Sequence, residues 1–282
     1  CWMNFEPHDY QAYAIDYIEA HPVAAVLLDM GLGKTVISLT AIADLLFDSF
    51  DAHRVLVVAP LRVARDTWPA EIEKWAHLQD LTYTVAVGSA RERKAALMVS
   101  ADITIINREN LNWLIESSGF PFDYDTVVID ELSSSKNHQS KRFKALLRVR
   151  PKVKRIIGLT GTPSSNGLMD LWAEFRLLDM GYRLGRFITQ YRNTFFLPDK
   201  RNGQIIYSYK PMPGAEEAIY SRISDITISM KSTDHLKMPE LVSTRYEVYL
   251  SDAEADRYEE LKQALILQFP DGEVTAANAA AL

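Results

Sequence analysis

Six short, continuously apolar runs within the first 160 residues constrain the fold of this chain more than any other feature. They cover residues 23–29, 54–59, 82–87, 102–107, 125–130 and 153–159. Segments with helical periodicity separate them, at 9–20, 34–49, 69–76, 90–99, 108–116 and 140–149. Apolar runs without alternation are typical of strands buried on both faces of a parallel sheet. We therefore expect an α/β fold, with a parallel sheet flanked by helices.

Composition excludes several classes of protein. The chain has 282 residues, of which 48% are hydrophobic and 24% are charged, as in ordinary soluble globular domains. The longest apolar runs are strand-sized, and the opening residues show no signal-peptide pattern. A single cysteine, Cys1, and six scattered histidines argue against a disulfide framework and a zinc site. We expect a cytoplasmic protein that is not secreted and does not contact a membrane.

One segment is clearly basic although the net charge of the chain is −6. It covers residues 133–155, SSSKNHQSKRFKALLRVRPKVKR. The negative net charge argues against a protein held on nucleic acid by bulk charge, but a local groove can be positive on an acidic molecule. The segment can be either a solvated helix face or a contact surface for nucleic acid.

The sequence MGLGKT lies between an apolar run and a helical pattern, which is the context of a phosphate-binding loop. Gly31 and Gly33 permit a backbone in which successive N–H groups point at phosphate oxygens. Lys34 would reach the β- and γ-phosphates, and Thr35 would hold Mg²⁺ through its hydroxyl. Leu28 stands where the broader GxxxxGK[ST] pattern has its first glycine.

A carboxylate pair, Asp130 and Glu131, ends the apolar run VVID. A P-loop enzyme needs an acidic residue at the end of a neighbouring strand to hold Mg²⁺. A second carboxylate beside it can orient the attacking water. Alone, the pair could equally be the acidic end of a buried strand. Together with Lys34, it predicts a catalytic site in which Asp130 binds the metal and Glu131 orients the water.

Beyond residue 180 the pattern becomes mostly helical. The segments YRLGRFITQYRNTFF and PGAEEAIYSRISD predict helices, while DKRNGQ predicts a turn with IIYSYK as its returning strand. The segment STRYEVYLSDAEADRYEELKQALILQF predicts a strand followed by a long helix, which a capping box at Ser251 and Glu254 begins.

The motifs DMGLGKT, VVIDE and LTGTPSSN, in this order and spacing, resemble those of the Swi/Snf-type ATPases of helicase superfamily two, in their bacterial or phage kind. HDYQ is similar to the adenine-reading glutamine motif of that family, and VLVVAPLRVARDTWPAEIEKW is similar to the next motif. ITIINRENL, LMDLWAEFRLLD and KSTDHLKMPEL extend the likeness over nearly the whole chain. The resemblance implies a first RecA-like lobe over 1–180, a helical insertion over 181–240, and the start of a bridge to a second lobe over 241–282.

The resemblance also assigns roles to individual residues. Gln11 would read the adenine base, and Leu32 would belong to the loop around the phosphates. Coupling between nucleotide and nucleic acid would run through Ser133, Thr160, Gly161 and Thr162. Ser133 departs from the usual Asp-Glu-Ala-His pattern, because it replaces the histidine. Nucleic-acid contacts would come from Pro60, Leu61, Arg62, Asn107, Arg108, Lys136 and Asn137. Three tryptophans at helical positions, Trp68, Trp75 and Trp113, are expected in the core.

The function implied by the resemblance is that of the ATP-binding lobe of a DNA-dependent ATPase and translocase, with ATP and Mg²⁺ as cofactors and double-stranded DNA as partner. We expect the chain alone to hydrolyse ATP poorly, because an arginine finger from the second lobe contributes about 10³–10⁵ in rate. One rival is a non-catalytic, nucleotide-gated module that binds nucleic acid or protein. Another rival, a small-molecule kinase, explains GLGKT but gives LTGTPSSN no purpose.

Overall fold

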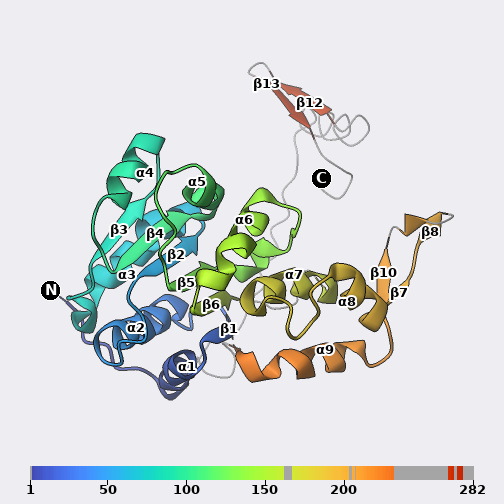
Figure 1. Cartoon of the computed structure of the whole chain (residues 1–282), viewed down its shortest axis with the longest axis horizontal. Coiled ribbons are helices and arrows are strands. Elements are labelled where there is room, and N and C mark those ends of the chain that lie inside the picture. The colour runs from blue at the N-terminus through green and yellow to red at the C-terminus, as the bar shows by residue number, and fades with distance from the viewer. Residues whose placement is uncertain are drawn as a thin grey trace, which may run out of the picture. The chain divides into compact units, whose positions relative to one another are not determined.

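Among the described residues, the main sheet has seven parallel strands in the order β11-β1-β6-β5-β2-β4-β3, of which Figure 1 labels β1 to β6. The computed structural model describes residues 2–161, 167–202, 205–206, 208–231, 266–269 and 272–275. The strands are β1 (Val23–Leu28), β2 (Val55–Ala59), β3 (Tyr83–Ala86), β4 (Ile103–Asn107), β5 (Thr126–Asp130), β6 (Arg155–Thr160) and β11 (Thr227–Met230). The six strands predicted from apolar runs are confirmed to within two residues at each end, and so is the predicted α/β fold class.

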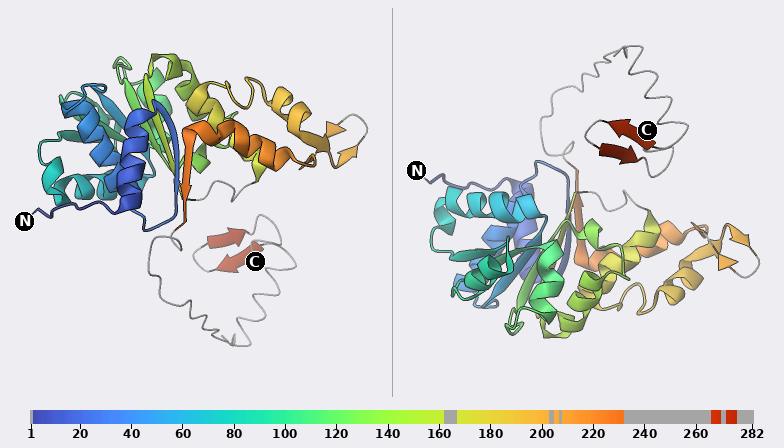
Figure 2. Two further views of the ribbon diagram at one scale, coloured as in Figure 1. Left: turned by 90° about the horizontal axis from the view of Figure 1, so that it is seen from below. Right: turned by 90° about the horizontal axis from the view of Figure 1, so that it is seen from above.

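Helices cover both faces of this sheet (Figure 2). They are α1 (Asp9–Ala20), α2 (Lys34–Phe47), α3 (Trp68–Lys74), α4 (Ala90–Leu97), α5 (Leu111–Glu116), α6 (Lys141–Val149) and α7 (Leu168–Asp179). Alternate residues of β1 enter two separate cores: Ala25 and Leu27 pack with α5, α6 and α7, whereas Val26 and Leu28 pack with α1, α2 and α3. This double burial explains why the strands are apolar without alternation.

The edge strand β11 was not predicted. It comes from the segment 181–240, which the sequence analysis assigned to a helical insertion, and it pairs in parallel with β1, with Thr227 beside Ala25. Only Ile228 of its four residues is buried, so the strand lacks the apolar run that identified the other strands. The domain boundaries themselves stay a prediction.

The remainder of 181–231 contains the two predicted helices, but the segment between them differs from the prediction. The predicted turn DKRNGQ contains a two-residue strand, and the predicted strand IIYSYK contributes to two separate short strands. It contains α8 (Ile188–Phe195), β7 (Phe196–Pro198), β8 (Arg201–Asn202), β9 (Ile205–Ile206), β10 (Tyr209–Pro211) and α9 (Ala215–Ile223). The strand β7 pairs antiparallel with β10, and β8 pairs antiparallel with β9. The first of these helices begins at Ile188, later than the segment YRLGRFITQYRNTFF predicts, because Gly181 and Gly185 adopt φ values of +88° and +98°.

Residues 239–282 form a second compact unit. Its described part is an antiparallel hairpin of β12 (Ile266–Phe269) and β13 (Gly272–Thr275). The prediction of a long helix that runs through Phe269 is therefore wrong for the last four residues of that helix, Ile266–Phe269, which form β12. The run ILQF is followed by Pro-Asp-Gly, which is a stronger signal for a hairpin than for a helix end. The predicted strand and the rest of that helix lie outside the described residues, as does KSTDHLKMPEL apart from its first residue. None of the described helices is long and apolar enough to cross a membrane.

Candidate nucleotide-binding site

The loop between β1 and α2 has the backbone that a phosphate-binding loop requires. Gly31 and Gly33 adopt φ values of +86° and +82°, in the left-handed region, and Gly33 caps the N-terminus of α2. A Cβ atom on Gly33 would lie only 2.8 Å from Nε2 of Gln11. The loop therefore needs glycine at this position both for its backbone angles and for the close approach of α1.

Helix α1 holds this loop from one side. Gln11, which is buried, donates a hydrogen bond from Nε2 to the carbonyl oxygen of Leu32 at 3.3 Å. The hydroxyl of Tyr10 donates to the same oxygen at 3.3 Å, and the backbone N–H of His8 donates to Oε1 of Gln11 at 3.0 Å. The structure thus brings the predicted adenine-reading residue into direct contact with the phosphate-binding loop.

Lys34 lies at the centre of the site. Its Nζ donates a hydrogen bond of 2.7 Å to the carbonyl oxygen of Leu28, and a Cβ on Gly161 would lie 3.6 Å from it. Partial burial lowers the pKa of Lys34, while the nearby carboxylates of Asp130 and Glu131 oppose this shift. The ammonium group therefore lies within the field of the carboxylate pair, and its bond to a carbonyl can be exchanged for one to a phosphate oxygen.

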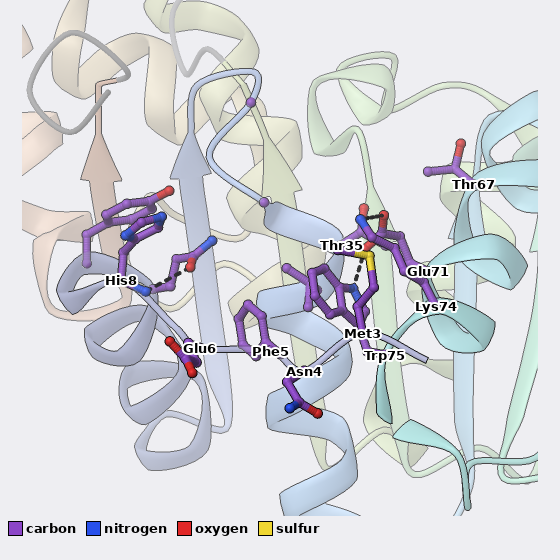
Figure 3. A pocket seen from close by; sticks show the side chains of 15 residues that line it. Met3, Asn4, Phe5, Glu6, His8, Thr35, Thr67, Glu71, Lys74 and Trp75 are labelled. Carbon is purple, nitrogen blue, oxygen red and sulfur yellow. Dashed lines mark hydrogen bonds and ion pairs between the residues drawn. The ribbon is translucent and has the colours of Figure 1, made fainter. Parts of the chain in front are cut away.

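An open cleft of about 500 Å³ lies beside the loop (Figure 3). The N-terminal segment from Met3 to His8 runs along it between α1 and α3. Backbone hydrogen bonds fix this segment, from Met3 N–H to the Lys74 carbonyl at 2.8 Å and from Ala76 N–H to the Met3 carbonyl at 2.9 Å. Trp75 meets Phe5 edge to face, with ring centroids 5.2 Å apart. Gln11, the glycine-rich loop with Gly31 and Gly33, and the aromatic rings of Phe5 and Trp75 therefore line one cleft.

Asp130 ends β5 with its carboxylate largely buried. Its Oδ2 accepts a hydrogen bond of 2.9 Å from Nε1 of Trp68, the first residue of α3. Burial raises the pKa of Asp130, as does the neighbouring Glu131, whereas the indole and Lys34 lower it. Trp68 is fully buried, as expected of a core residue, but sequence reasoning missed its contact with the predicted metal ligand.

Glu131 has a left-handed backbone, with φ 62° and ψ 63°. This conformation is rare outside glycine and occurs most often where the surroundings require it, as at active sites. Oε1 of its carboxylate accepts hydrogen bonds from the hydroxyls of Ser133, at 2.8 Å, and Thr160, at 3.4 Å. The structure thus brings three of the four predicted coupling positions to the site, at Ser133, Thr160 and Gly161. The fourth, Thr162, lies outside the described residues.

The predicted nucleic-acid residues follow the carboxyl ends of β2, β4 and β5, at the edge of the sheet that carries the site. Leu61, Arg62, Lys136 and Asn137 are exposed, while Pro60 and Arg108 are half-buried. Asn107 is buried, with 5% exposure, and its amide donates to Oε2 of Glu109 at 2.9 Å. Of this set, Asn107 is the least available for a contact with a ligand.

Two arginines of the basic segment 133–155 are neither solvated nor available to nucleic acid. Arg150 is 4% exposed and donates from Nε to the carbonyl of Leu177 at 2.9 Å and from Nη2 to that of Leu178 at 2.5 Å. Arg155 is 6% exposed and donates from Nη1 to the carbonyl of Ile18 at 2.6 Å. Both guanidinium groups satisfy carbonyls at helix C-termini, where a cation also interacts favourably with the helix dipole.

Glu174, in α7, is a buried carboxyl group that sequence reasoning missed. Burial raises its pKa to about 8, with further increases from the charges of Asp170 and Glu131, while Lys136 opposes the shift. It is 3% exposed. The group is therefore a buried and largely neutral acid at neutral pH, close enough to Glu131 to be influenced by its charge.

Comparison with known proteins gives a match to a family model over most of the chain. Residues 19–278 match the model of the SNF2-related domain. Protein p41 of Acyrthosiphon pisum secondary endosymbiont phage 1 is 34% identical over 99% of this chain and 62% of its own length. YwqA of Bacillus subtilis, whose name designates an ATP-dependent helicase/translocase, is 26% identical over 89% of this chain and 27% of its own. The chain therefore spans less than two thirds of the length of either relative.

A solved structure shares the fold. The SWI2/SNF2 ATPase core of Sulfolobus solfataricus, in complex with double-stranded DNA, superposes with a TM-score of 0.66 at 23% identity. The match covers 94% of this chain and 55% of the other. A second structure, of the SWI2/SNF2 ATPase core domain of Sulfolobus solfataricus, matches with a TM-score of 0.61 at 24% identity, over 94% of this chain and 54% of the other.

Proposed function

Because the chain belongs to the SNF2-related domain family, we propose that it is the ATP-binding lobe of a DNA-dependent ATPase that moves along double-stranded DNA. One observation carries this proposal. Lys34, at the start of α2, lies near the adjacent carboxylates Asp130 and Glu131 at the end of β5, beside a loop in which Gly31 and Gly33 adopt positive φ values. Such a constellation suits phosphoryl transfer, in which positioning and electrostatic stabilisation do most of the work.

The residues at this edge fit ATP and Mg²⁺. The hydroxyl of Thr35 and the carboxylate of Asp130 are oxygen ligands, which Mg²⁺ prefers, and bound Mg²⁺ would neutralise charge on the phosphates. The backbone N–H groups around Gly31 to Gly33 and the N-terminus of α2 would bind the phosphates. Lys34 would exchange the carbonyl of Leu28 for a phosphate oxygen. Gln11, which already contacts Leu32, would read the base in the cleft.

Glu131 would orient the attacking water. Its carboxylate is held by Ser133 and Thr160, and Thr160 ends β6, the strand that leads into LTGTPSSN. A shift of Thr160 would therefore change the hydrogen bonds of the water-orienting group. We infer that coupling between nucleotide and nucleic acid runs along this path, with Gly161 and Thr162 as its continuation.

Double-stranded DNA would lie along the edge that exposes Leu61, Arg62, Lys136 and Asn137. Contacts there would be to phosphates and would read no sequence. A net charge of −6 is compatible with such a track if positive charge is local. The proposal includes a second RecA-like lobe that supplies an arginine finger, and it divides this chain into a first lobe over 1–180, a helical insertion over 181–240 and a bridge over 241–282.

Phosphate release from Mg-ATP tests the proposal. We would measure it with and without duplex DNA, on this chain and on a form that carries the second lobe. We expect this chain to bind Mg-ATP weakly and to hydrolyse it barely, because a missing arginine finger lowers the rate by about 10³–10⁵. The two-lobed form should turn over, and duplex DNA should accelerate it. Rapid turnover by this chain alone would contradict the two-lobe requirement.

Substitution of Glu131 separates a motor from a nucleotide-gated module. In the two-lobed form, Glu131→Gln should lower turnover by about 10²–10⁴ because the glutamine amide cannot accept a proton from water, while Mg-ATP affinity is retained. A motor would also lose movement on DNA. If Glu131→Gln leaves movement or other biological activity intact, the gated-module interpretation replaces the translocase.

A further inference from the structure

Trp68 links the surface predicted to face DNA with the carboxylate predicted to hold the metal. Its ring is fully buried, and its Nε1 donates to Oδ2 of Asp130 at 2.9 Å. The two residues are 62 positions apart and lie on different elements, α3 and β5. A buried indole N–H needs an acceptor, but here that acceptor is the carboxylate at the centre of the site rather than a backbone carbonyl.

The helical segment that carries Trp68 begins at the predicted DNA contacts. Ala64 N–H donates to the carbonyl of Pro60 at 2.8 Å, so helical bonding begins at the end of β2. A wide turn over Val63–Thr67 follows, in which Trp68 N–H bonds the carbonyl of Val63, five residues back. Such wide turns inside helices are rare and often mark functional sites. Leu61 and Arg62 project at the start of the segment and are exposed.

A neutral donor suits the task of orienting a metal ligand. The indole fixes one carboxylate oxygen without neutralising the charge that Mg²⁺ would bind, whereas a lysine or arginine would compete with the metal. Groups that orient metal ligands in this way typically contribute 10–100-fold in metal affinity or activity. Because Trp68 and Ile72 are the two residues of α3 that are buried in the core, a displacement of the helical segment must move the donor as well.

We propose that Trp68 is a positioning residue, which orients the carboxylate of Asp130 for Mg²⁺ and transmits to it the contact of Leu61 and Arg62 with the duplex. The proposal rests on the proposed function, since it needs a metal–nucleotide complex at Asp130 and a duplex at the end of β2. It adds a route from DNA to the metal that is separate from the route through Thr160 and Glu131.

The first test compares two phenylalanine variants. Trp68→Phe keeps most of the ring volume and removes the donor. Trp172→Phe is the matched control, since Trp172 is also buried and donates from Nε1 to the carbonyl of Gly185 at 2.9 Å. Binding of a fluorescent ATP analogue is measured with Mg²⁺ and with EDTA. We expect Trp68→Phe to weaken binding in Mg²⁺ about 10–100-fold and to leave binding in EDTA unchanged, with Trp172→Phe unchanged in both.

The outcomes separate this proposal from the proposed function. If the wild-type chain shows no Mg²⁺-dependent nucleotide binding, the proposed function fails and the role of Trp68 fails with it. If the wild type binds and Trp68→Phe binds equally well, or loses affinity equally with and without Mg²⁺, only the positioning role is overturned. Equal losses in both phenylalanine variants would likewise indicate a purely structural effect.

The second test concerns transmission from the duplex. Saturating duplex DNA should change the affinity of the wild type for Mg-ATP, and Trp68→Phe should abolish this change while its own affinity for the duplex is retained. Transmission is overturned if duplex DNA still changes the Mg-ATP affinity of Trp68→Phe, or if duplex DNA does not change the affinity of the wild type.

If Trp68→Phe does not fold, the indole N–H resonance of Trp68 is followed in the wild type instead. The resonance is assigned by replacing the other four tryptophans in turn. It should shift on addition of Mg²⁺ and again on addition of duplex, and a resonance that does not respond to the duplex refutes transmission.

Discussion

Ser133 donates a hydrogen bond from its Oγ to Oε1 of Glu131 over 2.8 Å. The family pattern that this chain resembles has a histidine at this position, so the sequence left the coupling of Glu131 in question. The structure shows that the shorter side chain still reaches the carboxylate, because the left-handed backbone of Glu131 is followed at once by a turn of 3₁₀-helix over Leu132–Ser135. Thr160 adds a second hydroxyl to the same oxygen, at 3.4 Å.

Replacement of Ser133 by alanine should slow ATP turnover in the two-lobed form without changing nucleotide affinity. The variant removes the shorter of the two hydrogen bonds that orient Glu131, and a hydrogen bond to a charged group is worth about 1.5–3 kcal/mol. We expect a loss of about tenfold or more in kcat with KM for ATP unchanged. Ser134→Ala is the control, since the hydrogen bonds recorded for Ser134 use its backbone. Equal kcat values for the two variants would contradict a role for Ser133.

The central fold could be predicted because each inner strand is a continuous apolar run with a polar or glycine-containing segment after it. All five residues of β2 and all five of β4 are buried, so burial of both faces is visible in their sequences as mostly apolar runs. The strand β11 could not be found in this way, because it has only four residues, pairs with β1 from 202 positions away and buries only Ile228. The hairpin β12–β13 was missed because its first strand continues a helical pattern.

The candidate site could be predicted where its residues form local motifs. Lys34 belongs to a glycine-rich loop between strand and helix, and Asp130 ends a strand, so both are recognisable from neighbouring residues. The bond between Trp68 and Asp130 joins two distant segments, and no pattern within either indicates it. Glu174 was missed for a different reason: a charged residue in an amphipathic helix is normally placed on the solvated face, whereas α7 is buried nearly all round.

Replacement of Gly33 by alanine should weaken nucleotide binding more than a comparable glycine elsewhere. The new Cβ would meet Nε2 of Gln11 at 2.8 Å, in addition to the strain of φ +82°. Gly119→Ala is the control, since Gly119 has φ +83° with nothing within 4 Å of the added Cβ. Both variants should lose about 1 kcal/mol of stability from backbone strain. Only Gly33→Ala should lower the affinity for the ATP analogue, by about tenfold or more. Titration of the two variants with the analogue measures this, and equal affinities would contradict the contact between the added Cβ and Gln11.

The buried carboxyl of Glu174 should make folding stability depend on pH. Burial raises its pKa to about 8, far above the ordinary value of 4.5 in the unfolded chain. Its contribution to stability is therefore fully present below pH 4.5 and is lost as the pH rises toward 8, because the unfolded chain ionises first. Glu174→Gln should raise the free energy of unfolding at pH 8 and flatten its slope between pH 5 and 8, as urea titrations would show. Glu217→Gln, at an exposed position of α9, is the control and should leave the slope unchanged. A wild-type slope that persists in Glu174→Gln would exclude Glu174 as its source.

Replacement of Arg150 by lysine should destabilise the folded chain. Its guanidinium group donates to three carbonyls, from Nε to Leu177, from Nη2 to Leu178 and from Nη1 to Val153, at 2.9, 2.5 and 2.8 Å. A lysine ammonium group is a point charge without the planar fork, so it cannot satisfy all three in this geometry. We expect Arg150→Lys to lower the free energy of unfolding by about 2–4 kcal/mol.

The matched control for this change lies on α6. The side chain of Arg148 is 67% exposed and pairs with Glu116, so Arg148→Lys should alter the free energy of unfolding by less than about 0.5 kcal/mol. Urea unfolding of both variants decides the question. Equal stability of the two would mean that Arg150 does not cap the C-terminus of α7. A large difference would show that this part of the basic segment stabilises the fold, so that DNA-binding measurements on segment 133–155 should use its exposed residues, such as Lys136.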